Sequence, residues 1–138
     1  MDKQELAEIR KHLGKTQKQL AQLLGVSFKA IKSFEQGWRN IPAYIERQVI
    51  FLLAADGALN KKTKPCWVIK KCPMTIRQNC PAWELKVGQL CWFINGTICE
   101  GEAKNDWTEK MKICRKCKVF KSMIPFTGSV VHRKSQPR

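Results

Sequence analysis

The stretch from Thr16 to Pro42, TQKQLAQLLGVSFKAIKSFEQGWRNIP, predicts two short helices joined by a tight turn. Thr16 is a suitable N-cap, and Gln19 three residues later completes a capping box. Gly25 stands where a left-handed residue would end the first of the two helices. A connection of about three residues makes the helices cross steeply, so one face of the second helix stays free.

Apolar residues at helical spacing extend this pattern on both sides of the turn. An earlier helix is expected between Asp2 and His12, and a later one begins near Pro42. We therefore predict that residues 1–56 form a mainly α bundle of about four helices. The residues expected to face its interior are Leu6, Ile9, Leu13, Leu20, Leu23, Leu24, Ile31, Phe34, Ile45, Val49, Leu52 and Leu53.

The same stretch resembles the phage-repressor-like helix-turn-helix family, of Cro/C1 type and also called XRE. Proteins of this family place the second helix of the motif in the major groove, so the resemblance implies double-stranded DNA as a partner. The matching marks are Thr16-Gln17, Leu20-Ala21, Leu24-Gly25-Val26-Ser27, Ile31, Glu35, Gly37 and Pro42.

The resemblance also assigns residues to the DNA contact. Lys29 would donate hydrogen bonds to guanine, and Phe28 would lie on a thymine methyl group. Phe28 is bulky and apolar where the family often has a polar residue, so it either weakens direct readout or packs against the second domain. The full set of expected DNA-binding residues is Gln17, Ser27, Phe28, Lys29, Lys32, Ser33, Arg39 and Asn40, of which Gln17, Lys32, Arg39 and Asn40 are suited to phosphates.

Charge is distributed unevenly along the chain, whose formal net charge is +15. Residues 1–60 carry nine Lys or Arg and six Asp or Glu, whereas residues 61–138 carry seventeen and five. Excess positive charge of this size attracts polyanions, chiefly nucleic acid or an anionic membrane surface. The second half therefore adds phosphate contacts or binds an acidic partner itself.

The sequence opens without an apolar leader, and no run approaches the roughly 20 apolar residues that a membrane helix needs. We expect a cytoplasmic protein that does not enter a membrane. Thiols stay reduced in that compartment, so cysteines there are better suited to metal or cluster binding than to disulfides. The odd number of cysteines agrees, since a full set of disulfides would leave one over. The seven candidate ligands are Cys66, Cys72, Cys80, Cys91, Cys99, Cys114 and Cys117.

Two Cys-Trp pairs mark the cysteine-rich segment, and two Cys-Pro pairs lie between them. The strings CWVIKKCP, CPAWE, CWFINGTICEG and CRKCKVF resemble the small module known as the two-CW domain, over about residues 66–120. That module is associated with bacterial and archaeal regulators and sensor proteins. Its biochemical role is poorly defined, so the resemblance implies a regulatory module without a mechanism.

Four thiolates suffice for an iron–sulfur cluster or for a structural zinc ion. We favour the cluster, because prolines follow two of the cysteines, as in ferredoxin-type loops, and most of the cysteine gaps do not fit a zinc ribbon. Zinc stays open as the alternative cofactor, and so do free or disulfide-forming thiols. The first ligands expected are Cys72, Cys80, Cys114 and Cys117, with Cys66, Cys91 and Cys99 as competitors.

The sequence thus predicts a helix-turn-helix bundle (1–56), a linker (57–65), a small irregular or α+β cysteine-rich module (66–121) and a basic, disordered tail (122–138). A hairpin is expected over residues 93–98, where Asn95-Gly96 suits a tight turn.

The function expected is sequence-specific transcriptional regulation, with a cluster that senses redox state, oxygen or iron. The alternatives are a regulator with a structural zinc module, or an adaptor whose cysteine-rich module docks a protein partner. A homodimer is also compatible, since such proteins often read paired half-sites. No enzymatic activity is expected, because the strand–helix setting of a redox C-x-x-C motif is missing around Cys114 and Cys117.

Overall fold

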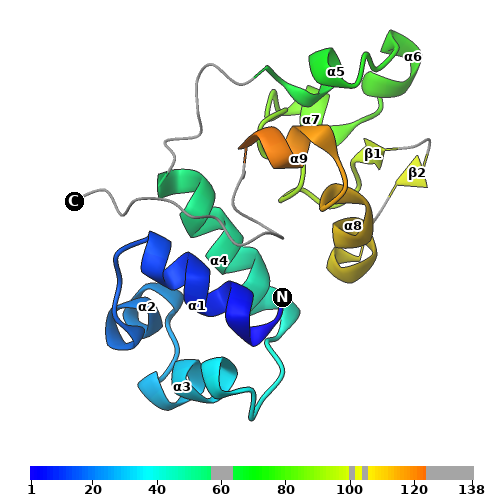
Figure 1. Cartoon of the computed structure of the whole chain (residues 1–138). Helices are drawn as coiled ribbons and strands as arrows, with labels where there is room; N and C mark the ends of the chain where they lie inside the picture. Colours follow the sequence, from blue (N-terminus) through cyan, green and yellow to red (C-terminus); the bar gives the residue numbers. More distant parts are fainter. Residues whose placement is uncertain (57–63, 100–101, 104–105, 124–138) are drawn as a thin grey trace. The chain divides into compact units, whose positions relative to one another are not determined.

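A computed structural model describes residues 1–56, 64–99, 102–103 and 106–123 of the chain (Figure 1). It divides into two compact units, one formed by Met1–Asp56 and the other lying within Gly57–Pro125. Most of the predicted linker and of the predicted basic tail lies outside the described residues. None of the described helices is long and apolar enough to cross a bilayer.

The first unit is a bundle of four helices, which confirms the predicted mainly α fold. The helices are α1 (Lys3–His12), α2 (Gln17–Leu24), α3 (Phe28–Gln36) and α4 (Ala43–Asp56). One expected core position is wrong. Leu23 is 51% exposed, because Leu20, Ala21 and Leu24 take the inward face of α2. The buried apolar residues of this unit are Leu6, Ile9, Leu13, Leu20, Ala21, Leu24, Ala30, Ile31, Phe34, Ile45, Val49, Ile50, Leu53 and Ala54.

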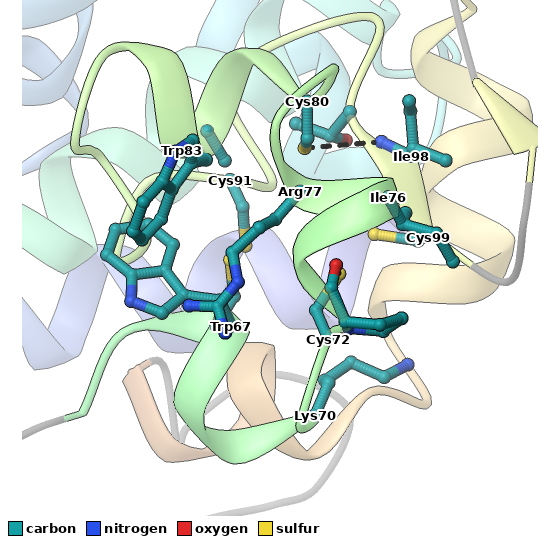
Figure 2. A pocket seen from close by; sticks show the side chains of 14 residues that line it. Trp67, Lys70, Cys72, Ile76, Arg77, Cys80, Trp83, Cys91, Ile98 and Cys99 are labelled. Carbon is teal, nitrogen blue, oxygen red and sulfur yellow. Dashed lines mark hydrogen bonds between the residues drawn. The ribbon is translucent and has the colours of Figure 1, made fainter.

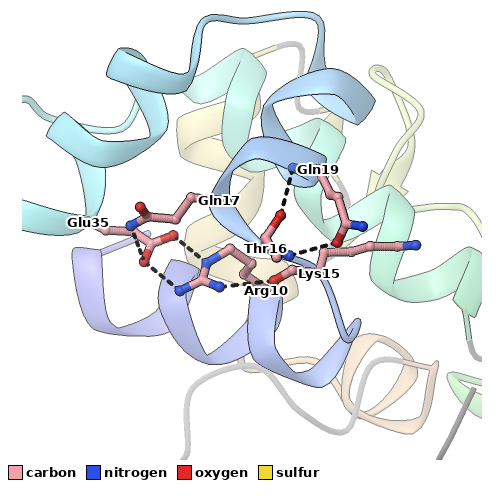
Figure 3. A network of polar contacts seen from close by, with 6 residues as sticks. All are labelled: Arg10, Lys15, Thr16, Gln17, Gln19 and Glu35. Carbon is pink, nitrogen blue, oxygen red and sulfur yellow. Dashed lines mark hydrogen bonds and ion pairs between the residues drawn. The ribbon is translucent and has the colours of Figure 1, made fainter.

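Side chains and glycines fix the ends of α2 and α3 as the sequence predicts. The backbone N–H of Gln19 donates to the Thr16 hydroxyl at 3.1 Å, and the N–H of Thr16 donates to the Gln19 side chain at 2.9 Å (Figure 3). Gly25 then ends α2 in the left-handed region, with φ of 68°. Ser27 caps α3, accepting from the N–H of Ala30 at 3.1 Å. These caps hold the turn between the two helices.

The second unit consists of short elements. They are α5 (Cys66–Ile69), α6 (Met74–Arg77), α7 (Pro81–Glu84), β1 (Ile98–Cys99), β2 (Glu102–Ala103), α8 (Trp107–Cys114) and α9 (Lys118–Met123). Pro65, Pro73 and Pro81 stand at the starts of α5, α6 and α7, where a missing N–H costs nothing. The chain therefore turns often, and successive cysteines return to the same region. Helix α9 continues to Met123, beyond the predicted boundary at residue 121.

The hairpin predicted over residues 93–98 is wrong. The strand pair of the described residues lies farther along, where Ile98–Cys99 pairs antiparallel with Glu102–Ala103. Residues 91–96 form turns before β1, and Gly96 takes a φ of 86° there. This displacement follows from Trp92, whose ring is fully buried and anchors the segment in the core, away from any strand partner.

Aromatic rings and thiols form much of the core of the second unit. The ring of Trp92 makes edge-to-face contacts with Phe93, Trp107 and Phe120, at centroid distances of 5.7, 6.3 and 6.1 Å. Beside it lies a cluster of small apolar groups and thiols formed by Cys80, Ala82, Cys91 and Val119, with Cys66, Ile69, Ile98 and Cys117 packed against it. Buried thiols thus take the place of aliphatic side chains.

The left-handed Gly25 allows a direct test of the turn. A Cβ added at Gly25 meets no atom within 4 Å, so substitution by alanine introduces backbone strain and no clash. We predict that Gly25→Ala lowers the free energy of unfolding by about 1–2 kcal/mol. Gly25→Asn should lower it less, because asparagine tolerates this conformation better. Urea unfolding measures both, and equal losses for the two variants would contradict the account.

Candidate functional site

Helix α3 buries one face and exposes the other. Ala30, Ile31 and Phe34 face the core of the first unit, with Ile31 at 0% exposure. Lys29 and Lys32 lie on the solvent side, and Ser27, which caps the helix, is exposed as well. The exposed face of α3 therefore presents two cations on a rigidly packed helix.

The carboxylate of Glu35 joins α1, α2 and α3 (Figure 3). The Arg10 guanidinium donates to both of its oxygens, from Nε at 2.7 Å and from Nη2 at 3.0 Å. The amide of Gln17 donates to the same carboxylate at 3.2 Å. Arg10 also donates to the Lys15 carbonyl at 2.9 Å. Since both charged side chains are largely buried, this bidentate pair fixes the position of α3 relative to its neighbours.

Sequence reasoning missed Arg10 and the role of Glu35. No local pattern marks Arg10, because its partner lies in another helix. Gln17 was expected to contact a phosphate, and the structure adds a hydrogen bond that holds α2 against α3.

The other residues expected at DNA lie at both ends of α3. Phe28, in its first turn, is 43% exposed. Ser33 is half-buried on α3, while Arg39 and Asn40 are exposed after the Gly37 turn. The Arg39 guanidinium lies 5.1 Å from the centroid of the Phe34 ring. The structure thus keeps these residues in one unit with α3, although their contact with DNA stays a prediction.

A pocket of about 190 Å³ lies within the second unit (Figure 2). We call it the thiol pocket, because five cysteines line it: Cys66, Cys72, Cys80, Cys91 and Cys99. One of them already receives a backbone hydrogen bond, from the N–H of Ile98 to the sulfur of Cys80 at 3.4 Å. The sequence favoured Cys72 and Cys80 together with Cys114 and Cys117. In the structure, Cys72 and Cys80 line the pocket together with the three cysteines ranked as competitors. Cys114 and Cys117 do not line it.

Two cationic side chains, Lys70 and Arg77, line the thiol pocket, and its lining among the described residues includes no carboxylate. The Arg77 guanidinium lies 4.9 Å from the centroid of the Trp83 ring, and Figure 2 shows it reaching from α6 toward Trp67 and Trp83. Its buried Nε has no hydrogen-bond partner among the described residues. Positive charge and aromatic rings thus share one wall of the pocket.

Lys110 is a buried cation of the second unit, and sequence reasoning missed it. Its residue exposure is 2%, and its ammonium donates to the hydroxyl of Thr97, which lines the thiol pocket. Within the part of the chain that the structure describes, no carboxylate forms an ion pair with it. An ammonium buried without an opposite charge is costly, so this position calls for a negative neighbour.

The thiols of the second unit differ in acidity. A hydrogen bond from Cys91 lowers the pKa of Cys66, whereas the same hydrogen bond, together with burial, raises the pKa of Cys91 well above its ordinary value. Burial raises the pKa of Cys99, and it raises the pKa of Cys114 to about 11. The charge of Lys110 opposes the effect of burial at both. Most of these thiols are therefore neutral at pH 7 when no metal is bound.

The donor chemistry suits a thiolate-bound group, but the spacing does not suit a single ion. Among the described residues, no three or more His, Cys, Asp or Glu side chains are placed to hold one metal ion. A tetrahedral zinc site needs four sulfurs converging at about 2.3 Å from one point. An iron–sulfur cluster holds its cysteines farther apart, because several metal and sulfide atoms lie between them. Five thiols around one pocket fit the second arrangement better.

Residues 6–44 match a protein-family model described as helix-turn-helix. The match runs from α1 to the start of α4 and includes all of α2 and α3. It supports an XRE-type, DNA-binding transcription regulator, and families of this kind are generally not enzymes. The match does not extend into the cysteine-rich unit. No curated protein and no solved structure matches the chain.

Removal of Glu35 tests the contact that positions α3. Glu35→Ala leaves the Arg10 guanidinium buried without its partner, so we predict a loss of roughly 3 kcal/mol in the free energy of unfolding. The double variant Arg10→Met/Glu35→Leu should be less destabilised than Glu35→Ala, because it removes both charges. Denaturant titrations followed by circular dichroism compare them. A double variant as unstable as the single one would show that the ion pair is not the source of the loss.

Cys114 gives a prediction for the stability of the metal-free protein. Its pKa is about 11 in the folded state and lower in the unfolded chain, so above pH 9 the unfolded chain binds fewer protons than the folded one. Stability should therefore be insensitive to this thiol below pH 9 and fall between pH 9 and 11. Cys114→Ala should make that fall shallower in denaturant titrations across this range. An unchanged slope would contradict the assignment.

Proposed function

We propose that this chain is a sequence-specific DNA-binding transcriptional regulator whose second unit holds an iron–sulfur cluster and senses redox state, oxygen or iron. One observation carries the DNA-binding part. Helix α3 is capped at its start and buried along one face, and it exposes Phe28, Lys29 and Lys32 within the segment that matches the helix-turn-helix family.

In this proposal α3 enters the major groove. The Lys29 ammonium donates to guanine O6 and N7, and the exposed ring of Phe28 lies on a thymine methyl group. Lys32, Arg39 and Asn40 contact phosphates and set the register of the helix on the duplex. Glu35 supports this readout indirectly, because it holds α3 in place through Arg10 and Gln17.

The thiol pocket supports the sensing part of the proposal. It supplies more than the four cysteines that one cluster needs, and its cationic wall suits the negative charge of thiolate ligands. When bound, a cluster would supply electron-transfer and oxygen-sensitive chemistry. Helices α5, α6 and α7 carry pocket residues and are short, so their arrangement depends on what the pocket holds. A structural zinc module and a partner-docking adaptor are the alternatives.

Substituting two lysines of α3 one at a time distinguishes contacts with bases from contacts with phosphates. We predict that Lys29→Ala weakens binding to a selected duplex by about 1–3 kcal/mol and relaxes sequence preference at one position. Lys32→Ala should weaken binding similarly on all sequences and reduce the salt dependence by about one ion. Selection from a random duplex library supplies the target, and fluorescence anisotropy at several salt concentrations measures affinity.

Lys11→Ala is the matched control, because it removes an exposed lysine of the first unit outside α2 and α3. It should leave the affinity within about twofold of that of the unsubstituted chain. If the Lys29→Ala/Lys32→Ala double variant bound every duplex as tightly as the unsubstituted chain, the adaptor alternative would replace DNA binding. Equal affinity of cluster-bound and cluster-free protein would remove the sensing role alone.

A further inference from the structure

Among the described residues of the second unit, one deeply buried ammonium has no carboxylate paired with it. Lys110 lies on α8 and is almost completely buried, yet its ammonium is held by the neutral hydroxyl of Thr97. Burial of Thr97 itself is nearly complete, at 1% exposure. A hydroxyl dipole compensates an ammonium only in part.

Lys110 acts electrostatically on three thiols of the second unit, Cys66, Cys99 and Cys114, and the first two of these line the thiol pocket. Thr97 lines the same pocket, so it stands between the ammonium and the space that the thiols surround. The one acidic residue of α8, Glu109, is exposed and pairs with Lys112 at 2.9 Å. Lys110 thus faces donors that become negative only when they lose a proton.

We propose that Lys110 is the counter-cation of the thiol pocket and that the bound group is anionic, held by thiolates drawn from Cys66, Cys72, Cys80, Cys91 and Cys99. This inference rests on the proposed function of the second unit as a metal- or cluster-binding module. It adds which thiols bind, what charge the site carries and which residue balances that charge.

The charge balance favours an anionic group of either kind, while the placement of the thiols suits a cluster better than a single zinc ion. Each thiol that becomes a ligand releases one proton. Four thiolates around one zinc ion, or around a cubane cluster with a core charge of +2, leave a net charge of −2. Such a charge inside the protein needs nearby cations. Lys110 supplies one from within the core, and Lys70 and Arg77 supply others at the wall.

The substitution Lys110→Met tests the inference, because methionine has a similar length and no charge. The matched control is Lys112→Met on the same helix, whose side chain is 67% exposed. Both variants and the unsubstituted full-length chain are purified without oxygen and stripped of metal. They are then loaded with iron and sulfide, or separately with zinc, and titrated against a chelator.

We expect Lys110→Met to weaken metal retention by at least about tenfold, and Lys112→Met to change it by less than about twofold. Folding stability of the metal-free protein should not follow the same trend. Without metal, Lys110→Met should be as stable as the unsubstituted chain or more stable, since it no longer buries an uncompensated charge. If a cluster forms, its midpoint potential should be lower in Lys110→Met, because a nearby positive charge favours the reduced, more negative state.

Each other result overturns a defined part of the argument. Metal retention in Lys110→Met equal to that of the unsubstituted chain would refute the counter-cation. A metal-free Lys110→Met that is less stable, or does not fold, would also refute it, because the lysine would then serve packing and not charge. An unsubstituted chain that retains neither iron nor zinc would instead overturn the proposed metal-binding function.

Single Cys→Ser variants test which thiols bind. Cys114→Ser and Cys117→Ser should keep the metal content of the unsubstituted chain, since neither thiol lines the pocket. At least four of the five pocket cysteines should each be required, as measured by metal per chain and, for iron, by absorption. Loss of metal in Cys114→Ser or Cys117→Ser would move the site out of the thiol pocket while leaving metal binding itself intact.

Discussion

The buried ammonium of Lys110 sets the main physical constraint on the second unit. A protein interior holds a charge only where other charges or hydrogen bonds replace the lost hydration. Here the ammonium donates to the hydroxyl of Thr97 and acts electrostatically on Cys66, Cys99 and Cys114. The unit also has little aliphatic core, and its short helices α5, α6 and α7 depend on packing among aromatic rings and cysteines. Charge and packing therefore both centre on the thiol pocket.

The first unit also buries a charge, but its own side chains neutralise that charge. Its buried Glu35 carboxylate is paired with Arg10 and receives a hydrogen bond from Gln17, so this buried charge is balanced within the bundle. The packing of the bundle therefore needs no bound group, and α3 can present its exposed face to a partner without a change in the positions of the helices. This contrast is the basis for the proposal that the first unit reads DNA while the second unit binds an anionic group that balances its buried cation.

The sequence was informative wherever a signal was local. Caps at Thr16 and Ser27 and a left-handed Gly25 follow from residues close together in the chain, and the structure confirms them. Features that depend on distant partners were missed, among them the contact between Arg10 and Glu35 and the burial of Lys110. The hairpin failed for the same reason, since the burial of a tryptophan, and not the turn residues alone, decides where the strands pair.

The grouping of the thiols could not be predicted from the sequence either, because cysteine spacing indicates the type of ligand without showing which cysteines meet in space.

The most direct measurement is the absorption spectrum of the full-length chain purified without oxygen, with iron, sulfide and zinc determined per chain. The account predicts a brown protein with a broad band near about 400 nm and several irons and sulfides per chain. A colourless protein without iron would contradict the cluster.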